Sequence, residues 1–180
     1  MLVLVVGPSG VGKDTLIAYC RSRLTGDEGF VFARRAVTRP AGDSSEDHDA
    51  MSEEVFQRNA ADGDFAIHWR AHGLGYGLPA SVEDGLALGR TVVVNVSRSV
   101  IEDARRRYRR VTIVSVTAPR NILAGRLHGR GREAGDDIDQ RLARAETLYV
   151  GGSDVVHLDN SGPIEHAGEA MLRILRKSIR

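Results

Sequence analysis

The chain has 180 residues, of which 42% are hydrophobic, and its 25 basic and 24 acidic side chains leave a formal net charge of +1. This length fits one domain with its own core, and the balanced charge excludes the strongly basic field that would make nucleic acid or a membrane the default partner. A single cysteine, Cys20, excludes an internal disulfide framework, and no apolar run approaches the length of a membrane span.

The first part of the chain carries the clearest motif. Residues 2–6 read LVLVV, which is typical of a strand buried on both faces, and residues 16–24 have the apolar spacing of a helix. Between them, residues 7–15 read GPSGVGKDT, a phosphate-binding loop of the GxxxxGK type in which Asp14 replaces the usual Ser or Thr. The glycine spacing does not fit a dinucleotide loop, and the lysine disfavours a simple glycine-rich turn. We therefore expect a mononucleotide site at the helix N-terminus.

Apolar runs and helical patterns alternate along the rest of the chain. A short helix is expected between Pro79 and Gly89, with Ser81 and Asp84 as a capping box. The other predicted helices cover residues 52–61, 99–108, 119–127 and 163–179, and the predicted strands cover residues 30–37, 65–71, 91–96, 111–116 and 155–158. This alternation predicts an α/β fold with a central, mainly parallel sheet flanked by helices, and with ligands at the carboxyl ends of the strands.

Three segments have the composition of loops. Residues 38–49 form a polar, acidic segment suited to binding, and a glycine-rich turn is expected from residue 72 through Gly77. Residues 128–137 are rich in Gly, Arg and acidic residues, have no apolar stripe and interrupt two helical segments, so we interpret them as a mobile lid.

Together with the loop at residues 7–15, three further segments make the chain resemble guanylate kinases over nearly its full length. They read TRP at residues 38–40, GLGYG at residues 73–77, and RLHGRG at residues 126–131, the last followed by Arg141. The resemblance implies that Arg39 and Tyr76 hold the phosphate of the acceptor. It also implies that arginines of the lid and its flanks clasp the transferring phosphates, as suits the bidentate guanidinium group. These arginines are Arg126, Arg130 and Arg141, and Arg132 either joins them or pairs with Glu133 in the lid.

The departures from guanylate kinases concentrate where that family binds the guanine base. Ile67 stands in place of a glutamate, Leu78 and Pro79 in place of hydroxyl residues, and Asn95 in place of an aspartate at the end of the central strand. A polar site that loses its donors and acceptors forfeits most of its affinity for the base. We therefore do not expect GMP to be the acceptor.

A closer resemblance is to ribose 1,5-bisphosphate phosphokinase of phosphonate catabolism. The segments that carry it read KD at 13–14, EDH at 46–48, FAIHW at 65–69, AHGLGYGLP at 71–79, NVSR at 95–98 and RGRE at 130–133. The resemblance implies ATP-dependent phosphorylation of the 1-phosphate of ribose 1,5-bisphosphate, giving 5-phosphoribosyl 1-diphosphate and ADP. A guanylate kinase with an altered base pocket is the alternative enzyme. A non-catalytic guanylate-kinase-like binding module is disfavoured, because it would not need Lys13 or the loop glycines.

As a P-loop kinase, the chain is expected to form a single domain of three parts. Residues 1–37, 90–127 and 151–180 would form the core, residues 38–89 the acceptor-binding region, and residues 128–150 the lid. We expect a cytoplasmic enzyme with two small-molecule substrates, ATP and ribose 1,5-bisphosphate, and with neither nucleic acid nor a membrane as partner. The oligomeric state stays open, with a homodimer as one option.

The donor side of the site is predicted to bind ATP with Mg²⁺. Asp14 binds the metal through its carboxylate, or Thr15 does so through its hydroxyl with Asp14 acting through a water molecule. Asn160 either contacts adenine, as its counterpart does in guanylate kinases, or forms a turn. The predicted ATP-binding residues are Gly7, Pro8, Ser9, Gly10, Val11, Gly12, Lys13, Asp14, Thr15, Arg126 and Asn160.

The acceptor side is predicted to work without a general base, because the accepting oxygen belongs to a phosphate that is ionised at neutral pH. Two substrate phosphates ask for two cationic sites, which gives Arg98 a role. The predicted substrate-binding residues are Arg39, His48, Trp69, His72, Tyr76, Asn95 and Arg98, and the predicted catalytic residues are Lys13, Arg39, Arg130 and Arg141.

Several residues also have a structural interpretation. Trp69 is more often a core residue than a ligand, and Cys20 is expected in the core. His68 and His72 are four residues apart in an extended segment, so they do not form a helical metal pair. The arginines at residues 105–110 lie at a helix C-terminus, where a solvated end that complements the helix dipole is favoured over nucleic-acid binding.

Overall fold

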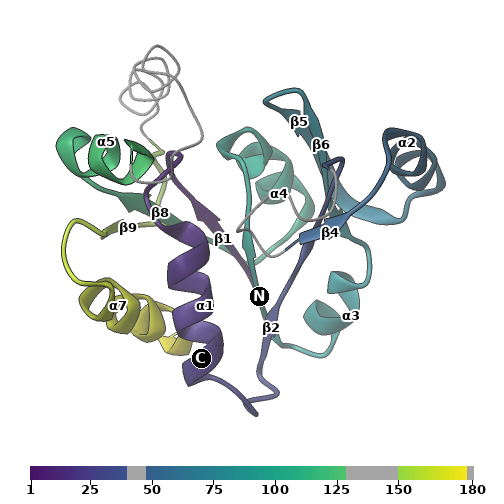
Figure 1. The fold of residues 1–180 in the computed structure, drawn as a ribbon. Coiled ribbons are helices and arrows are strands. Elements are labelled where there is room, and N and C mark those ends of the chain that lie inside the picture. The colour runs from purple at the N-terminus through teal and green to yellow at the C-terminus, as the bar shows by residue number, and fades with distance from the viewer. Residues whose placement is uncertain (40–47, 129–149, 178–180) are drawn as a thin grey trace.

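The computed structural model describes residues 1–39, 48–128 and 150–177. Within these ranges the chain forms a five-stranded sheet flanked by helices and a smaller four-stranded sheet (Figure 1). The predicted α/β fold with a central parallel sheet is confirmed. No helix in the described ranges is long and apolar enough to span a membrane.

The five-stranded sheet has the order β2-β7-β1-β8-β9, and all its neighbouring strands are parallel. All five residues of the central strand β1 are fully buried, which is why this segment is a continuous apolar run. Because these strands run parallel, the carboxyl ends of β1, β7 and β8 lie at one edge of the sheet. The strands are β1 (Leu2–Val6), β2 (Phe30–Phe32), β7 (Thr91–Asn95), β8 (Val111–Thr117) and β9 (Val155–Asp159).

Helices cover both faces of this sheet. On one face α1 (Lys13–Arg23), α5 (Arg120–His128) and α7 (Ile164–Lys177) share a core that contains Leu16, Cys20 and Met171. The hydroxyl of Tyr19 also donates a hydrogen bond to Glu169 at 2.8 Å, which joins the neighbouring helices α1 and α7 (Figure 1). The other face packs against α3 (Val82–Ala87) and α4 (Ile101–Arg107).

The four-stranded sheet has the order β4-β3-β6-β5. The strands β5 (Phe65–Ala71) and β6 (Leu74–Pro79) form an antiparallel hairpin, and β6 also pairs with β3 (Arg35–Val37). The short strand β4 (His48–Ala50) runs parallel to β3. The helix α2 (Glu53–Asp62) packs on this sheet through Phe56, which contacts Phe65 in a small separate core.

Most predicted helices and strands agree with the structure to within one or two residues, but the strand expected over residues 30–37 is wrong as a single element. The chain forms β2 at the edge of the parallel sheet, leaves it after Phe32, and enters the second sheet as β3. Both halves have strand-forming sequences, so only the tertiary pairing separates them. This break places Arg35 in the second sheet.

The glycine-rich segment before Pro79 is also different from the prediction, because Leu74–Pro79 is the strand β6 and only His72 and Gly73 form the turn. Its glycines leave room for aromatic rings, since a Cβ added at Gly75 would lie 2.8 Å from Cε1 of Phe56. Glycine inside a strand is typical of such a close approach.

Two smaller predictions for helix ends need correction. Ser81 has helical backbone angles and makes no capping hydrogen bond, so it does not begin a capping box. The helix expected over residues 99–108 is divided into a 3-10 turn, η1 (Arg98–Val100), followed by α4. Cys20 is confirmed as a core residue, fully buried, and its burial raises the pKa of the thiol to about 12.

Candidate active site

The phosphate-binding loop leaves the carboxyl end of β1 and enters α1 at Lys13. Gly12 caps the helix with a left-handed backbone, φ +94°, and a Cβ there would lie 2.6 Å from Nδ2 of Asn160. A Cβ at Gly10 would lie 3.1 Å from Cδ2 of Leu127 in α5. Glycine at both positions therefore allows α5 and the segment after β9 to pack directly against the loop.

The ammonium group of Lys13 lies over the loop. Its Nζ donates hydrogen bonds to the carbonyl oxygens of Gly7 at 2.9 Å and Pro8 at 3.0 Å. These bonds hold the positive charge beside the first turn of α1, where the helix dipole also favours an anion.

Two predicted ATP-binding residues meet at the carbonyl oxygen of Val11. Nδ2 of Asn160 donates to it at 2.7 Å, and Nη1 of Arg126 in α5 donates to it at 3.4 Å. Asn160 is only 3% exposed, and its Oδ1 has no hydrogen-bond partner among the described residues. The amide therefore positions the phosphate-binding loop, a role that neither of the two sequence interpretations included. Contact with adenine stays a prediction.

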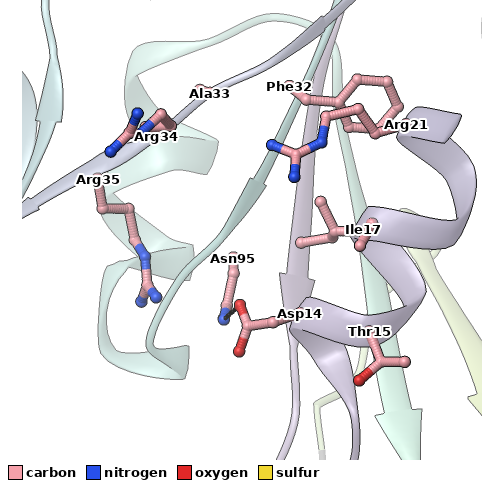
Figure 2. A pocket seen from close by; sticks show the side chains of 10 residues that line it. Asp14, Thr15, Ile17, Arg21, Phe32, Ala33, Arg34, Arg35 and Asn95 are labelled. Atoms are coloured by element: carbon pink, nitrogen blue, oxygen red, sulfur yellow. Dashed lines mark hydrogen bonds between the residues drawn. The ribbon is translucent and has the colours of Figure 1, made fainter. Parts of the chain in front are cut away.

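Asp14 and Asn95 come together because β1 and β7 are neighbouring parallel strands with aligned carboxyl ends. Nδ2 of Asn95 donates a hydrogen bond of 2.7 Å to Oδ1 of Asp14 (Figure 2). Asn95 is buried, with 7% of its surface exposed, so the amide fixes the carboxylate without adding a charge.

A cavity of about 380 Å³ opens beside this pair. It lies between α1, the end of β2, the start of β3 and the end of β7 (Figure 2). Its polar lining combines one carboxylate with hydroxyl, amide and guanidinium groups, which suits a phosphorylated ligand. The polar lining residues are Asp14, Thr15, Arg21, Arg34, Arg35 and Asn95.

Comparison with known proteins identifies the family to which this arrangement belongs. No protein-family model matches the chain. A curated relative from Chelativorans sp., named ribose 1,5-bisphosphate phosphokinase PhnN, is 47% identical over 179 residues, which cover 99% of this chain and 86% of the relative. The chain belongs to the ribose 1,5-bisphosphate phosphokinase family.

Other members of the ribose 1,5-bisphosphate phosphokinase family give the same result. The relative from Brucella melitensis is 46% identical over 175 residues, covering 97% of this chain and 91% of its own length. The relative from Rhodopseudomonas palustris is 48% identical over 175 residues, covering 97% and 88%. Among solved structures, the guanylate kinase from Anaplasma phagocytophilum has a TM-score of 0.64 at 21% identity, covering 98% of this chain and 84% of its own, and shows the fold alone. The predicted family is confirmed.

Most of the residues predicted to bind the acceptor substrate lie on the four-stranded sheet or beside it. Arg39 lies two residues after β3, half-buried, and His48 begins β4. Trp69 and Tyr76 are cross-strand neighbours whose rings stack at 5.4 Å, and both are buried in the core between the two sheets. His72 is exposed in the hairpin turn, with φ +51°.

Arg98 lies in η1, three residues after Asn95 at the carboxyl end of β7. Its Nε is buried without a hydrogen-bond partner among the described residues, and desolvation lowers the pKa of the guanidinium below its usual value. A desolvated cation at this edge of the sheet remains a good candidate for a phosphate ligand. Arg130, Arg132 and Arg141 lie outside the described residues.

The sequence interpretation missed Arg21, Arg34 and Arg35, which also line the cavity. Arg34 and Arg35 lie a few residues before Thr38 and Arg39, but the single strand expected there gave no reason to place them at the site. The basic residues of α4 form ion pairs: Arg105 pairs with Asp154 at 2.7 Å, Arg107 with Glu83 at 2.7 Å, and Arg106 with Asp103.

Proposed function

We propose that this protein transfers the γ-phosphoryl group of ATP to the 1-phosphate of ribose 1,5-bisphosphate, giving 5-phosphoribosyl 1-diphosphate and ADP. The observation that carries the proposal is the 46–48% identity, over at least 97% of the chain, to relatives named for this activity. The intact phosphate-binding loop and the adjoining cationic cavity support it.

The donor phosphates would bind at the loop between β1 and α1. The backbone N–H groups of the loop and the α1 N-terminus favour an anion, and Lys13 supplies a positive charge that its hydrogen bonds to Gly7 and Pro8 already hold there. Asn160 and Arg126 keep the loop in shape through the Val11 carbonyl. The loop is therefore preorganised, which is the main contribution that a protein makes to phosphoryl transfer.

The residues beside the loop fit Mg²⁺. Asp14 offers a carboxylate, the next residue Thr15 offers a hydroxyl, and Asn95 orients the carboxylate without competing as a cation. Magnesium bound there would supply positive charge that neutralises the donor phosphates. We propose Asp14 as the direct ligand, because a carboxylate near phosphates is repelled unless a cation lies between them.

The acceptor needs alignment more than activation. An ionised oxygen of the 1-phosphate attacks the γ-phosphorus, the bond from that phosphorus to the β,γ-bridging oxygen breaks, and ADP leaves with the electron pair. No proton has to move, so we assign no general base. Arg39 and Tyr76 are proposed to hold the accepting phosphate, together with His48 and Arg98. Trp69, His72 and Asn95 complete the proposed acceptor set. Arg130 and Arg141 are proposed to stabilise the transferring phosphoryl group.

The proposed working compartment is the cytoplasm, and the proposed ligands are the two small molecules alone. ATP and sugar phosphates are available there. Cell fractionation with a tagged chain checks the location.

The experiment that tests the proposed function offers ATP with ribose 1,5-bisphosphate and, in parallel, ATP with GMP. We expect ADP formation with the sugar bisphosphate and at least about 100-fold lower kcat/KM with GMP, because the positions that bind guanine carry Ile67, Leu78 and Pro79. A Lys13→Met variant controls for contaminating kinases. Turnover of GMP without turnover of ribose 1,5-bisphosphate would refute the proposal.

A further inference from the structure

Arg35 is the only formally charged side chain in the buried set among the residues that the structure describes, with 7% of its surface exposed. Its neighbour Arg34 is different, since the Arg34 side chain is 51% exposed and forms an ion pair of 2.9 Å with Asp49. Placing a guanidinium in a poorly solvated position is costly, and it is tolerated where anionic or aromatic groups compensate. The surroundings that allow this burial therefore bear on the role of Arg35.

The surroundings of Arg35 hold its guanidinium in a defined place. The guanidinium carbon lies 5.6 Å from the centroid of the Tyr76 ring, within the range of a cation–π contact. Tyr76 is itself 7% exposed and stacks on Trp69 with an interplanar angle of 9°. A cation fixed against a rigid aromatic pair loses little side-chain entropy when it binds an anion.

Arg35 also lines the cavity beside the phosphate-binding loop. In Figure 2 its side chain lies on the opposite side of Asn95 from Asp14. The cavity thus has the carboxylate proposed for Mg²⁺ at one wall and a buried cation at another. An anionic group of the acceptor fits beside Arg35, away from Asp14.

We propose that Arg35 binds the 5-phosphate of the acceptor, and so determines the preference for a sugar bisphosphate over a sugar monophosphate. This inference rests on the proposed function. The proposed acceptor carries two phosphates, and Arg39 with Tyr76 is assigned to the phosphate that is extended. The second phosphate needs its own bidentate cation, and Arg35 offers one that is buried, oriented and in the wall of the cavity.

The test compares two acceptors that differ only in the 5-phosphate: ribose 1,5-bisphosphate and ribose 1-phosphate. In Arg35→Met we expect kcat/KM to fall about 100-fold for the bisphosphate and no more than about threefold for the monophosphate, so the preference collapses. Arg35→Lys keeps the charge without the bidentate fork and should lie between the two. Equal losses for both acceptors would overturn the inference, as would an unchanged preference.

Arg70 provides a matched control on the same sheet. Its guanidinium also lies 5.6 Å from an aromatic centroid, that of Phe56, but its side chain is 56% exposed, pairs with Glu53 and lies outside the cavity. Arg70→Met should leave the preference unchanged. Thermal melting of each variant separates folding from binding, and if Arg35→Met does not fold, Arg35→Lys and calorimetric titration with ribose 5-phosphate decide.

Two outcomes distinguish this inference from the proposed function. If the wild-type protein phosphorylates neither ribose compound, the proposed function fails. If the wild type prefers the bisphosphate and Arg98→Met removes the preference while Arg35→Met does not, the proposed function stands and the assignment to Arg35 is wrong.

Discussion

At the residue scale, the pair Asp14 and Asn95 is the most informative departure from a usual phosphate-binding loop. Such loops place a hydroxyl after the lysine, and the resemblance to guanylate kinases implies an acid at the position of Asn95. Here the carboxylate stands in the loop and the neutral amide at the strand end, joined by a bond of 2.7 Å. The exchange keeps a single negative charge at this place. This arrangement avoids two carboxylates at hydrogen-bond distance, which would repel each other.

This exchange predicts the behaviour of Asp14→Ala. The variant should bind ADP with little dependence on Mg²⁺ and lose about 100-fold in kcat, because the proposed direct metal ligand is gone. The double variant Asp14→Ala, Asn95→Asp returns the carboxylate to the strand end and should recover part of the Mg²⁺ dependence. Calorimetry of ADP binding over a range of Mg²⁺ concentrations measures both, and an unchanged dependence in Asp14→Ala would refute the metal role.

Gly12 gives a second prediction at this scale. In Gly12→Ala the new methyl group meets Nδ2 of Asn160, which holds the loop through Val11, and the left-handed backbone is strained as well. We expect ADP binding to weaken at least about tenfold and stability to fall by about 2–3 kcal/mol.

Gly89→Ala is the matched control for Gly12→Ala. Gly89 has φ +75°, but nothing lies within 4 Å of the added Cβ, so this variant isolates the backbone strain. It should lose about 1 kcal/mol in denaturant unfolding and bind ADP normally. Equal ADP affinities for the two variants would show that the contact between Gly12 and Asn160 does not shape the loop.

At the element scale, an arginine joins α4 to the segment that precedes β9. Arg105 donates from Nε and Nη2 to the Asp154 carboxylate at 2.9 and 2.7 Å, and from Nη2 to the Gly151 carbonyl at 2.8 Å. These bonds hold the pKa of Asp154 below its usual value. The link supports the edge of the sheet that leads through β9 to Asn160.

Arg105→Ala should lower the free energy of unfolding by about 1–2 kcal/mol at neutral pH. Because the native pKa of Asp154 is depressed, this contribution is complete above the unfolded pKa, about 3.9, and is lost as the pH falls through the native pKa. The difference between wild type and variant should therefore shrink below about pH 4. Denaturant unfolding at several pH values checks it.

Arg106→Ala is the control for Arg105→Ala. Arg106 also pairs with an acid, Asp103, but both side chains are more than half exposed, so the variant should change stability by less than about 0.5 kcal/mol at every pH. A loss of stability as large as that of Arg105→Ala would mean that the hydrogen bonds of Arg105 to Asp154 and Gly151 stabilise the fold no more than an exposed ion pair does.

At the scale of the whole molecule, the sequence predicted the core better than the site. The run LVLVV and the glycines after it could be read directly, because a strand buried on both faces and a phosphate-binding loop have local signatures. The division of residues 30–37 between two sheets has no local signature, since β2 and β3 differ only in the strands that they pair with. Arg35 was missed as a site residue for this reason.

The same limit applies to the contacts of the predicted site residues. Asn95 was expected to contact the acceptor, and the structure brings it to the cavity but also bonds it to Asp14, a contact that depends on the register of β1 and β7. Asn160 was expected at adenine or in a turn, and its bond to Val11 depends on how β9 lies against the loop. Residue types and spacing indicate chemistry, whereas partners are set by tertiary packing.

The central claim is that the chain extends the 1-phosphate of ribose 1,5-bisphosphate, and phosphorus-31 NMR of the reaction with ATP tests it most directly. The account predicts two new coupled diphosphate resonances from a sugar 1-diphosphate, together with an unchanged 5-phosphate monoester signal and the signals of ADP. A diphosphate formed only when GMP is supplied, or at the 5-position of the sugar, would contradict the account.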